Sequence, residues 1–520
     1  MCPMTLPEPD RQPLHRHFEW WAKNAGDRIA VTEVGATEGS TTYRALDRDA
    51  NRLAHRIVKS GVEPGQLVGV SAARGVRLLT GLLAVLKAGC GYVPLDPAYP
   101  RSRLEMVADD CELGLVVGES AHSGWVAGTG AGFVGVDDPA LVAEPDHDQP
   151  WSASLHDPMY VIHTSGSTGR PKGVVVPHVC VPRLFSASRR TVRFGPDDVW
   201  IGLHSFSFDF SVWEMWGALA HGGRYVTVSQ NTARDPEELW SVIVHQDITV
   251  LCQTPTAFRW LAPVALNAGR LPDSLRLVML GGEQLTPTML SPWLAAYGDH
   301  KPHLINMYGP TETTVHATLR RIRTADAGRT DSPIGQPLDD VRIRLLHPDG
   351  TPVGLGEVGE MYISGAGVTA GYLNRRKMNS ERFLPATEGP PGSLMYRTGD
   401  LARLTPSGDL IFQGRADRQV QVRGFRIEPG EVEALVAGVP GVEQCAVTPR
   451  HNEDGELELV AYVVGDAVSP REIRRALSTV APPHILPAAI VAVNALPLTP
   501  QGKLDVEALV PSNKPVPPVP

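Results

Sequence analysis

The sequence is poor in the features that mark several large classes of protein. Its six cysteines, in 520 residues, are scattered and include no Cys-x-x-Cys pair, which argues against a disulfide framework or a zinc site and favours a reducing compartment. No stretch approaches the roughly 18 apolar residues that a membrane span needs, and the polar start lacks the apolar core of a secretory signal. The net charge of −9 argues against nucleic acid as the main partner. We therefore expect a cytoplasmic protein that binds neither nucleic acid nor membranes.

What is present describes a globular protein of more than one domain. A chain of 520 residues is too long for one ordinary hydrophobic core. A strongly apolar helical pattern over residues 77–87 is followed by a strand that begins at residue 92, and further alternation of this kind predicts stacked α/β units. The segment 122–152 is rich in Gly, Ala, Asp and Pro and is expected to be a surface excursion.

The last part of the chain has a pattern of its own. Residues 418–509 predict a small α+β domain, with strands over 419–423, 444–448 and 457–463 and helices over 429–437 and 470–480. The final ten residues, PSNKPVPPVP, contain too few apolar side chains to fold and are expected to be disordered.

A glycine-rich loop between two apolar runs carries the strongest chemical signal. Residues 159–162 and 174–176 predict buried strands, and the loop between them, 164–173, is TSGSTGRPKG. Its glycines let the backbone approach an anion, its hydroxyls and free N–H groups can surround phosphate oxygens, and Lys172 can pair with their charge. It is not a Walker A loop, which needs Ser or Thr after the lysine and a helix to follow. A flexible surface turn is the alternative, but the density of donors favours phosphate binding.

An acidic residue inside an aromatic run is the second unusual feature. Asp209 lies in HSFSFDFSVWE, between Phe208 and Phe210, and a buried carboxylate costs several kcal/mol unless it is paired. One interpretation is that Asp209 caps the following helix, which is common. The other is that it is the counter-ion of a ligand cation in an aromatic pocket, which the phosphate-type loop makes the favoured hypothesis.

These motifs and four later ones resemble, in the same order, those of the adenylate-forming (ANL) superfamily, which includes acyl-CoA synthetases, luciferases and the adenylation domains of nonribosomal peptide synthetases. The resemblance covers about residues 15–509 and rests on the loop at 164–173, FDFS at 208–211, YGPTE at 308–312, YRTGD at 396–400, GRADRQ at 414–419 and PQGKLD at 500–505. It implies an α/β core of stacked sheets with a β-barrel-like subdomain over 1–416, a small mobile α+β lid over 417–509 and a disordered tail over 510–520.

The resemblance implies that the chain binds ATP together with Mg²⁺. Tyr308 offers a ring for adenine, and a carboxylate at Asp400 suits the ribose hydroxyls. The implied nucleotide-binding residues are Thr164, Ser165, Gly166, Ser167, Thr168, Gly169, Lys172, Asn306, Tyr308, Thr311, Asp400 and Arg415.

The resemblance also assigns the catalytic groups, which are Thr164, Lys172, Glu312 and Lys503. Glu312 offers a hard oxygen ligand for Mg²⁺, although an acidic residue there could instead only offset a helix dipole. Lys503 by itself would be an ordinary solvated lysine, but it matches the lysine that binds the substrate carboxylate and the α-phosphate. Asp417 matches the pivot between the domains. One departure is Gln421, where the family often has lysine.

Asp209 decides the branch of the family, because the equivalent aspartate holds the α-ammonium of an amino acid and is generally missing from fatty-acid and aryl-acid activators. The family's selectivity positions fall on Asp209, Phe210, Trp213, Cys252, Met279, Gly281, Met307, Val315, His316 and Lys503. Their bulk implies a short substrate side chain. The set resembles the threonine-activating pattern, which has Asn at the place of Cys252 and usually Ile at that of Met279. Since Cys is a weak hydrogen-bond partner, we expect the substrate to be threonine, 2-aminobutyrate or valine. The last two should be activated better, relative to threonine, than is usual for the threonine-activating pattern.

The implied reaction has two steps. The substrate carboxylate attacks the α-phosphorus of ATP, and the aminoacyl-adenylate is then attacked by the phosphopantetheine thiol of a separate carrier protein after the small domain has rotated. No carrier segment follows and no HHxxxDG motif precedes, so a free-standing adenylation domain is expected, and a small MbtH-like helper is left open. A carboxylate–CoA ligase and a silent binding protein with the same fold are the alternatives; an aminoacyl-tRNA synthetase is disfavoured because HIGH and KMSKS motifs are absent.

Overall fold

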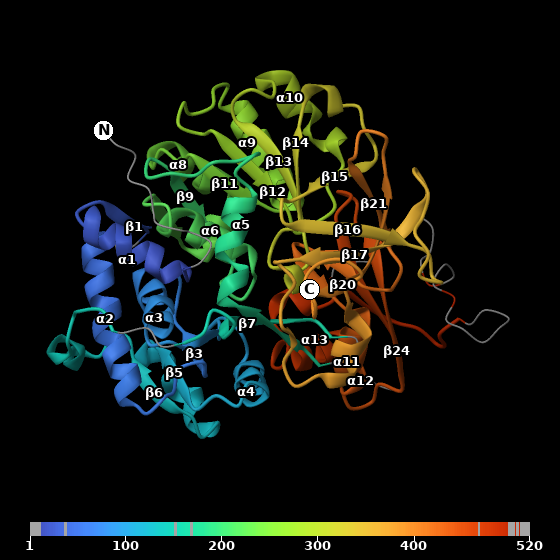
Figure 1. The fold of residues 1–520 in the computed structure, drawn as a ribbon. Coiled ribbons are helices and arrows are strands. Elements are labelled where there is room, and N and C mark those ends of the chain that lie inside the picture. The colour runs from blue at the N-terminus through green and yellow to red at the C-terminus, as the bar shows by residue number, and fades with distance from the viewer. Residues whose placement is uncertain are drawn as a thin grey trace.

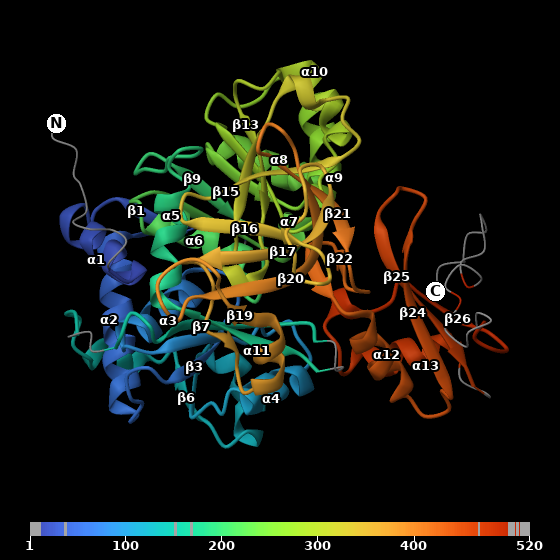
Figure 2. The same cartoon turned by 45° about the vertical axis from the view of Figure 1, so that its right-hand side comes forward.

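The structure is a computed structural model that describes residues 12–35, 39–149, 153–166, 170–465, 469–497, 505 and 509. A large domain of stacked sheets and helices makes up most of the chain, and a small α+β domain stands at its side (Figures 1 and 2). The predicted fold class is thereby confirmed. The exact boundary between residues 416 and 417 stays a prediction.

The largest sheet that the described residues form has fourteen strands. Its parallel strands are short runs of buried apolar residues, which is typical of a sheet that is covered on both faces. They are β1 (Ile29–Val34), β9 (Val199–Gly202), β10 (Arg224–Val228), β11 (Val250–Gln253), β12 (Leu277–Leu280) and β13 (His303–Tyr308).

The same sheet continues on both sides as antiparallel strands. At one edge is β2 (Gly39–Thr42), paired with β1. Beyond β13, the order is β14, β15, β21, β20, β17 and β16, and β19 pairs with β20. These strands are β14 (Thr318–Ile322), β15 (Ser332–Pro337), β16 (Val341–Leu346), β17 (Val358–Gly365), β19 (Phe383–Pro385), β20 (Leu394–Leu404) and β21 (Leu410–Arg415).

A second sheet of seven strands carries the glycine-rich loop. In spatial order it contains β18 (Gly371–Tyr372), β8 (Lys172–Pro177), β7 (Pro158–Thr164), β4 (Gly91–Pro94), β3 (Leu67–Ser71), β5 (Leu115–Gly118) and β6 (Gly132–Gly135). Strands β7 and β8 form the antiparallel pair expected around the loop. The prediction of a surface excursion over 122–152 was wrong for β6, which pairs in parallel with β5.

Helices cover the sheets and lie between them (Figure 1). They are α1 (Leu14–Asn24), α2 (Tyr43–Lys59), α3 (Val76–Lys87), α4 (Arg101–Asp110), α5 (Pro182–Ala187), α6 (Phe210–Leu219), α7 (Gln230–Arg234), α8 (Pro236–His245), α9 (Pro255–Asn267), α10 (Ser291–Tyr297) and α11 (Arg376–Arg382). Every residue of α6 is buried, and its tryptophans share one apolar cluster with side chains of both sheets. A helix that is apolar on all sides is one that is enclosed on all sides.

The small domain has its own core. Its elements are β22 (Val420–Val422), β23 (Phe425–Ile427), α12 (Pro429–Ala437), β24 (Gln444–His451), β25 (Leu457–Val464), α13 (Pro470–Ser478) and β26 (Ala489–Ala492). Val432, Val447 and Ile473 meet in this core. The five predicted elements are present, and β23 and β26 are additional.

Two expectations drawn from absences can be compared with the described part of the chain. Among the described residues, no helix is both long enough and apolar enough to cross a bilayer. The cysteines of this part, Cys90, Cys111, Cys180, Cys252 and Cys445, form no disulfide.

Candidate active site

The glycine-rich loop starts and ends on two paired strands. Thr164 ends β7 and lies opposite Lys172, the first residue of β8. The hydroxyl of Thr164 is buried and has no hydrogen-bond partner within the described residues. The backbone N–H of Gly166 donates to Glu431 of α12, at 3.3 Å. Ser165 is buried, and Ser167, Thr168 and Gly169 lie outside the described residues.

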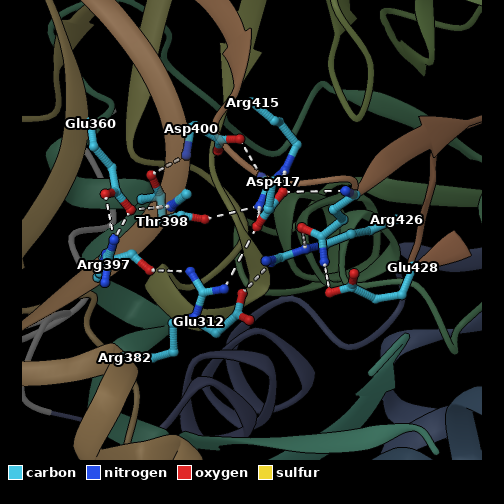
Figure 3. Close-up of polar contacts among 12 residues, drawn as sticks. Glu312, Glu360, Arg382, Arg397, Thr398, Asp400, Arg415, Asp417, Arg426 and Glu428 are labelled. Carbon is cyan, nitrogen blue, oxygen red and sulfur yellow. Dashed lines mark hydrogen bonds and ion pairs between the residues drawn. The ribbon is translucent and has the colours of Figure 1, made fainter. Parts of the chain in front are cut away.

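Glu312 is the centre of a buried ionic network. It lies in a short 3-10 turn, Thr311–Thr313, and is 0% exposed. Arg426 of β23 reaches it from the small domain, with Nη1 2.8 Å from Oε2 (Figure 3). On its other oxygen, the Tyr372 hydroxyl donates at 2.6 Å and Lys172 Nζ lies 3.3 Å away. The chain thus brings cations from two domains onto one carboxylate.

The charges of this network are set by its contacts. Burial alone would raise the pKa of Glu312, but Arg426 and Lys172 outweigh it and hold that pKa well below its usual range. Burial lowers the pKa of Lys172 to about 8, with Glu312 acting in the opposite direction. Glu312 is therefore a permanent anion, and it stays buried because its partners are cations.

A cavity of about 430 Å³ adjoins this network and lies between the domains. On one wall, the Tyr308 hydroxyl donates to Asp400 Oδ2 at 2.5 Å, and Arg415 forms an ion pair with the other oxygen of Asp400. Arg415 also contacts Asp417 at 2.7 Å (Figure 3). Burial raises the pKa of Asp400, against the lowering effect of Arg415. The small domain contributes Val447 and Leu457 to the lining.

Asn306 and Thr311 occupy the same region. Asn306 lines the cavity, and its side-chain amide donates to the carbonyl of Pro333 at 2.8 Å. Thr311 is buried beside Asp209, where its hydroxyl opposes the rise in the pKa of that carboxyl. Each described residue that the sequence analysis assigned to the nucleotide therefore lies at the loop, at the cavity or between them.

The donor set of this site fits a magnesium ion held mainly by its ligand. The described residues contain no group of three or more side chains that would hold a metal by themselves. Mg²⁺ commonly takes one or two carboxylates and fills its shell with phosphate oxygens and water. Glu312 supplies that kind of carboxylate, because it is ionised and lies 3.3 Å from Lys172, the register partner of Thr164 at the base of the loop.

Asp209 is a site carboxylate that makes no ion pair with a cation in the described structure and keeps one oxygen without any donor. It stands at the N-cap position of α6, but its side chain makes no capping hydrogen bond. It is 5% exposed, and its Oδ2 has no hydrogen-bond partner among the described residues. Burial raises its pKa to about 6. An unpaired buried carboxylate oxygen is costly, and this supports the counter-ion interpretation over the capping one.

The predicted selectivity side chains near Asp209 form an apolar and aromatic cluster. Cys252 of β11 and Met279 of β12 are register neighbours, and the Trp213 indole N–H donates to the Met279 sulfur at 3.4 Å. The His316 ring lies 5.3 Å from that of Phe210. Six of the predicted selectivity residues share one cluster, namely Phe210, Trp213, Cys252, Met279, Met307 and Val315.

Gly281, His316 and Cys252 set the space and the polarity within this cluster. A Cβ atom at Gly281 would lie 3.2 Å from the Met307 carbonyl and 3.5 Å from the Phe210 ring, so a larger side chain there would crowd both. Burial lowers the pKa of His316 to about 3, which keeps it neutral, and its Nε2 has no partner in the described part of the chain. Burial also keeps the Cys252 thiol protonated by raising its pKa. The tenth selectivity position, Lys503, lies outside the described residues.

Several site residues were missed by the sequence analysis. Arg426 and Tyr372 contact Glu312, and Glu431 contacts the glycine-rich loop at Gly166. Glu283 accepts from the Gly424 N–H at 2.7 Å. The segment RGFRIEPGE at 423–431 carried a signal, since two arginines, two glutamates and three glycines or prolines within nine residues are unusual. It did not identify their partners, which lie far away in sequence.

Two family models match the chain. A model described as AMP-binding enzyme matches residues 18–373, and one described as AMP-binding enzyme C-terminal domain matches residues 431–503. The first range includes the loop and Glu312, Lys172 and Tyr372 of the ionic network, whereas Arg426 lies between the two ranges.

Curated relatives are similar over nearly the whole chain. Syringomycin synthase SyrB1 of Pseudomonas syringae pv. syringae is 42% identical over 95% of this chain and 81% of that protein. Malpinin synthetase of Mortierella alpina is 43% identical over 96% of this chain, and a dimodular nonribosomal peptide synthase of Bacillus subtilis is 41% identical over 95%. The chain spans only 7% and 21% of those two relatives.

Solved structures agree with these matches. The structure of holo-PA1221, an NRPS protein containing adenylation and PCP domains, matches with a TM-score of 0.84 at 28% sequence identity. The match covers 96% of this chain and 84% of that one. NpsA-ThdA, an artificially fused adenylation-PCP di-domain from Klebsiella oxytoca, has a TM-score of 0.82 at 25% identity, covering 92% of this chain and 93% of that one.

Proposed function

Since the chain belongs to the AMP-binding enzyme family and is an adenylation domain of the nonribosomal peptide synthetase kind, an amino-acid adenylating ligase, we propose that it activates a small aliphatic L-amino acid. The substrate is threonine, 2-aminobutyrate or valine. The aminoacyl group is then transferred to the phosphopantetheine thiol of a separate carrier protein. The carrier is supported by the two structural neighbours, which both contain adenylation and PCP domains.

The observation that carries the amino-acid substrate is the unpaired Oδ2 of Asp209. A buried oxygen with no donor in the described structure gains a charge-assisted hydrogen bond when an ammonium group arrives. If a fatty acid or aryl acid were bound, this oxygen would stay unpaired and its desolvation cost would not be offset. Asp209 therefore favours amino-acid activation over the carboxylate–CoA ligase alternative.

The size of the substrate side chain follows from the pocket walls. Phe210, Trp213 and Met279 are all buried and contact one another or the same neighbours. The polar groups at the side-chain end are a neutral thiol and a neutral imidazole, Cys252 and His316. Because a thiol is a poor hydrogen-bond partner, discrimination between threonine and its apolar isosteres is expected to be small.

The first step needs two anions to meet, and this chain supplies the opposing charges. Lys172 and the loop N–H groups face the phosphates, Asp400 and Tyr308 hold the ribose and the base, and Lys503 bridges the substrate carboxylate and the α-phosphate. Mg²⁺ held at Glu312 would add a Lewis acid on phosphate oxygens. No general base is required since the nucleophile is ionised, so positioning carries much of the rate.

The second step requires the small domain to turn about Asp417. The contacts that would break include Arg426–Glu312, Gly166–Glu431 and Gly424–Glu283, at 2.8, 3.3 and 2.7 Å. They dock the small domain onto the loop and the carboxylate that a nucleotide would use. Such rotation separates the adenylation geometry from the thiolation geometry.

The test is amino-acid-dependent ATP–pyrophosphate exchange with a panel of amino acids, run with the parent chain and with Lys503→Ala. We expect exchange with threonine, 2-aminobutyrate and valine and a loss of at least about 100-fold in the variant. Addition of a small MbtH-like helper tests whether one is needed. Equal activity with phenylalanine or a fatty acid would overturn the pocket assignment, and no exchange with any substrate would favour a silent binding protein.

A further inference from the structure

A histidine–glutamate pair lies directly behind the amino-acid pocket and is used by no step above. His204 follows β9, and Glu214 lies on α6. His204 Nδ1 donates to Glu214 Oε1 at 2.8 Å, and Glu214 is 0% exposed. The backbone N–H groups of Leu203 and His204 also donate to this carboxylate, at 3.3 and 3.2 Å. The imidazole is thus held at one edge by a buried anion that has no other side-chain donor in the described structure.

This bond fixes the face that His204 presents to the pocket. Its ring stacks on Phe210, with centroids 4.4 Å apart and planes inclined by 23°. Phe210 also meets His316 edge-on at 5.3 Å, and its ring edge lies near Gly281. Stacked and edge-on contacts together enclose the ring. His204 therefore fills the space into which Phe210 would otherwise withdraw.

We propose that His204, oriented by Glu214, is a positioning residue that sets the length of the substrate side chain by holding Phe210 against the pocket. This inference rests on the proposed amino-acid activation. It adds a specificity-determining pair to the ten selectivity positions, although neither side chain needs to touch the substrate. An ordinary core position would accept any apolar residue, but here an apolar residue would leave Glu214 without its imidazole donor.

Three substitutions separate the two roles of the imidazole. His204→Asn keeps a donor for Glu214 and removes the ring from Phe210, His204→Phe keeps a ring and removes the donor, and His156→Asn is a control at an exposed histidine. Each variant is assayed with 2-aminobutyrate, norvaline and norleucine, whose side chains lengthen by one methylene at a time.

In His204→Asn, we expect the ratio of kcat/KM for norleucine over 2-aminobutyrate to rise about tenfold, mainly through KM. His204→Phe should give a ratio between those of the parent and His204→Asn, since a ring remains but the bond that orients it is lost. In a Phe210→Ala background, His204→Asn should change the ratio no further, because the two residues act through one wall. If His204→Asn does not fold, His204→Gln carries the same test.

An unchanged ratio in the folded Asn or Gln variant would overturn the inference, and so would a full additional shift in the Phe210→Ala background. The proposed function fails in a different way. If the parent chain activates none of threonine, 2-aminobutyrate and valine, the proposed function itself is contradicted. If the parent is active and the ratio does not move, only the role of His204 is contradicted.

Discussion

The nucleotide side and the amino-acid side of the site differ in how their buried carboxylates are compensated. At the nucleotide side, Glu312 is surrounded by Arg426, Lys172 and Tyr372. At the amino-acid side, Asp209 Oδ2 and His316 Nε2 have no partner among the described residues. A ligand of the first region must displace contacts that the protein already makes, whereas a ligand of the second supplies one that is missing. The first arrangement suits a site that is opened and closed by a moving domain, and the second suits recognition.

Neutralising Glu312 should have the largest effect on stability. In Glu312→Gln, Arg426 and Lys172 lose the charge that compensates their burial, so the free energy of unfolding should fall by about 3–5 kcal/mol. Urea unfolding measures this, with the exposed Glu388→Gln as a control. An unchanged unfolding free energy would mean that the network contributes no net stability.

Neutralising Asp209 should have the opposite sign. Burial raises the pKa of Asp209 from 3.8 to about 6, so the charged form is less favourable in the folded chain than in the unfolded one. Above pH 6 this difference costs on the order of 3 kcal/mol, and Asp209→Asn should recover part of it. The same urea experiment at pH 7.5 should show higher stability, with the exposed Asp197→Asn as a control. A large loss of stability would indicate a structural role for Asp209.

Amino-acid binding should depend on the ionisation of the same carboxyl. Because its raised pKa is about 6, Asp209 is mostly ionised at pH 7 and about one-tenth ionised at pH 5. The KM for the amino acid should therefore rise about tenfold as the pH falls from 7 to 5, while the KM for ATP changes less. Steady-state exchange kinetics measure both constants. A flat pH profile for the amino acid would argue against Asp209 as its counter-ion.

The smallest effect is expected at the docking contact of the small domain. Glu431 accepts from the loop N–H of Gly166 and lies 3.4 Å from Arg103. In Glu431→Gln, the negative charge that competes with phosphate for this N–H is removed. Mg·pyrophosphate should therefore bind about threefold more tightly. Calorimetric titration measures this, with the exposed Glu443→Gln as a control. Weaker binding in Glu431→Gln would show that the carboxylate supports the loop instead of competing with its ligand.

Local patterns were sufficient to predict much of the fold and the candidate positions. The apolar runs around the loop became β7 and β8, and α12 begins and ends at the predicted residues 429 and 437. The strand β6 was not predicted because Gly132-Phe133-Val134-Gly135 is short and bounded by glycines. This strand forms because it pairs with β5, and a local sequence pattern holds no information about that pairing.

The contacts between domains could not be predicted from the sequence. Arg426 and Glu312 are 114 residues apart, and Glu431 and Gly166 are 265 apart. The local motif around each residue does not specify its partner, and these contacts form only when the small domain docks. The pair His204–Glu214 is only ten residues apart, but its significance depends on where the Phe210 ring lies.

The most direct measurement compares 2-aminobutyrate with butyrate, which lacks only the ammonium group, in the parent chain and in Asp209→Asn. We expect the parent to prefer 2-aminobutyrate by about 100-fold or more in kcat/KM, and the variant to lose most of this preference while its apparent affinity for ATP is kept. A variant that still prefers the amino acid by the parental factor would contradict the assignment of Asp209 to the α-ammonium and, with it, the proposed substrate class.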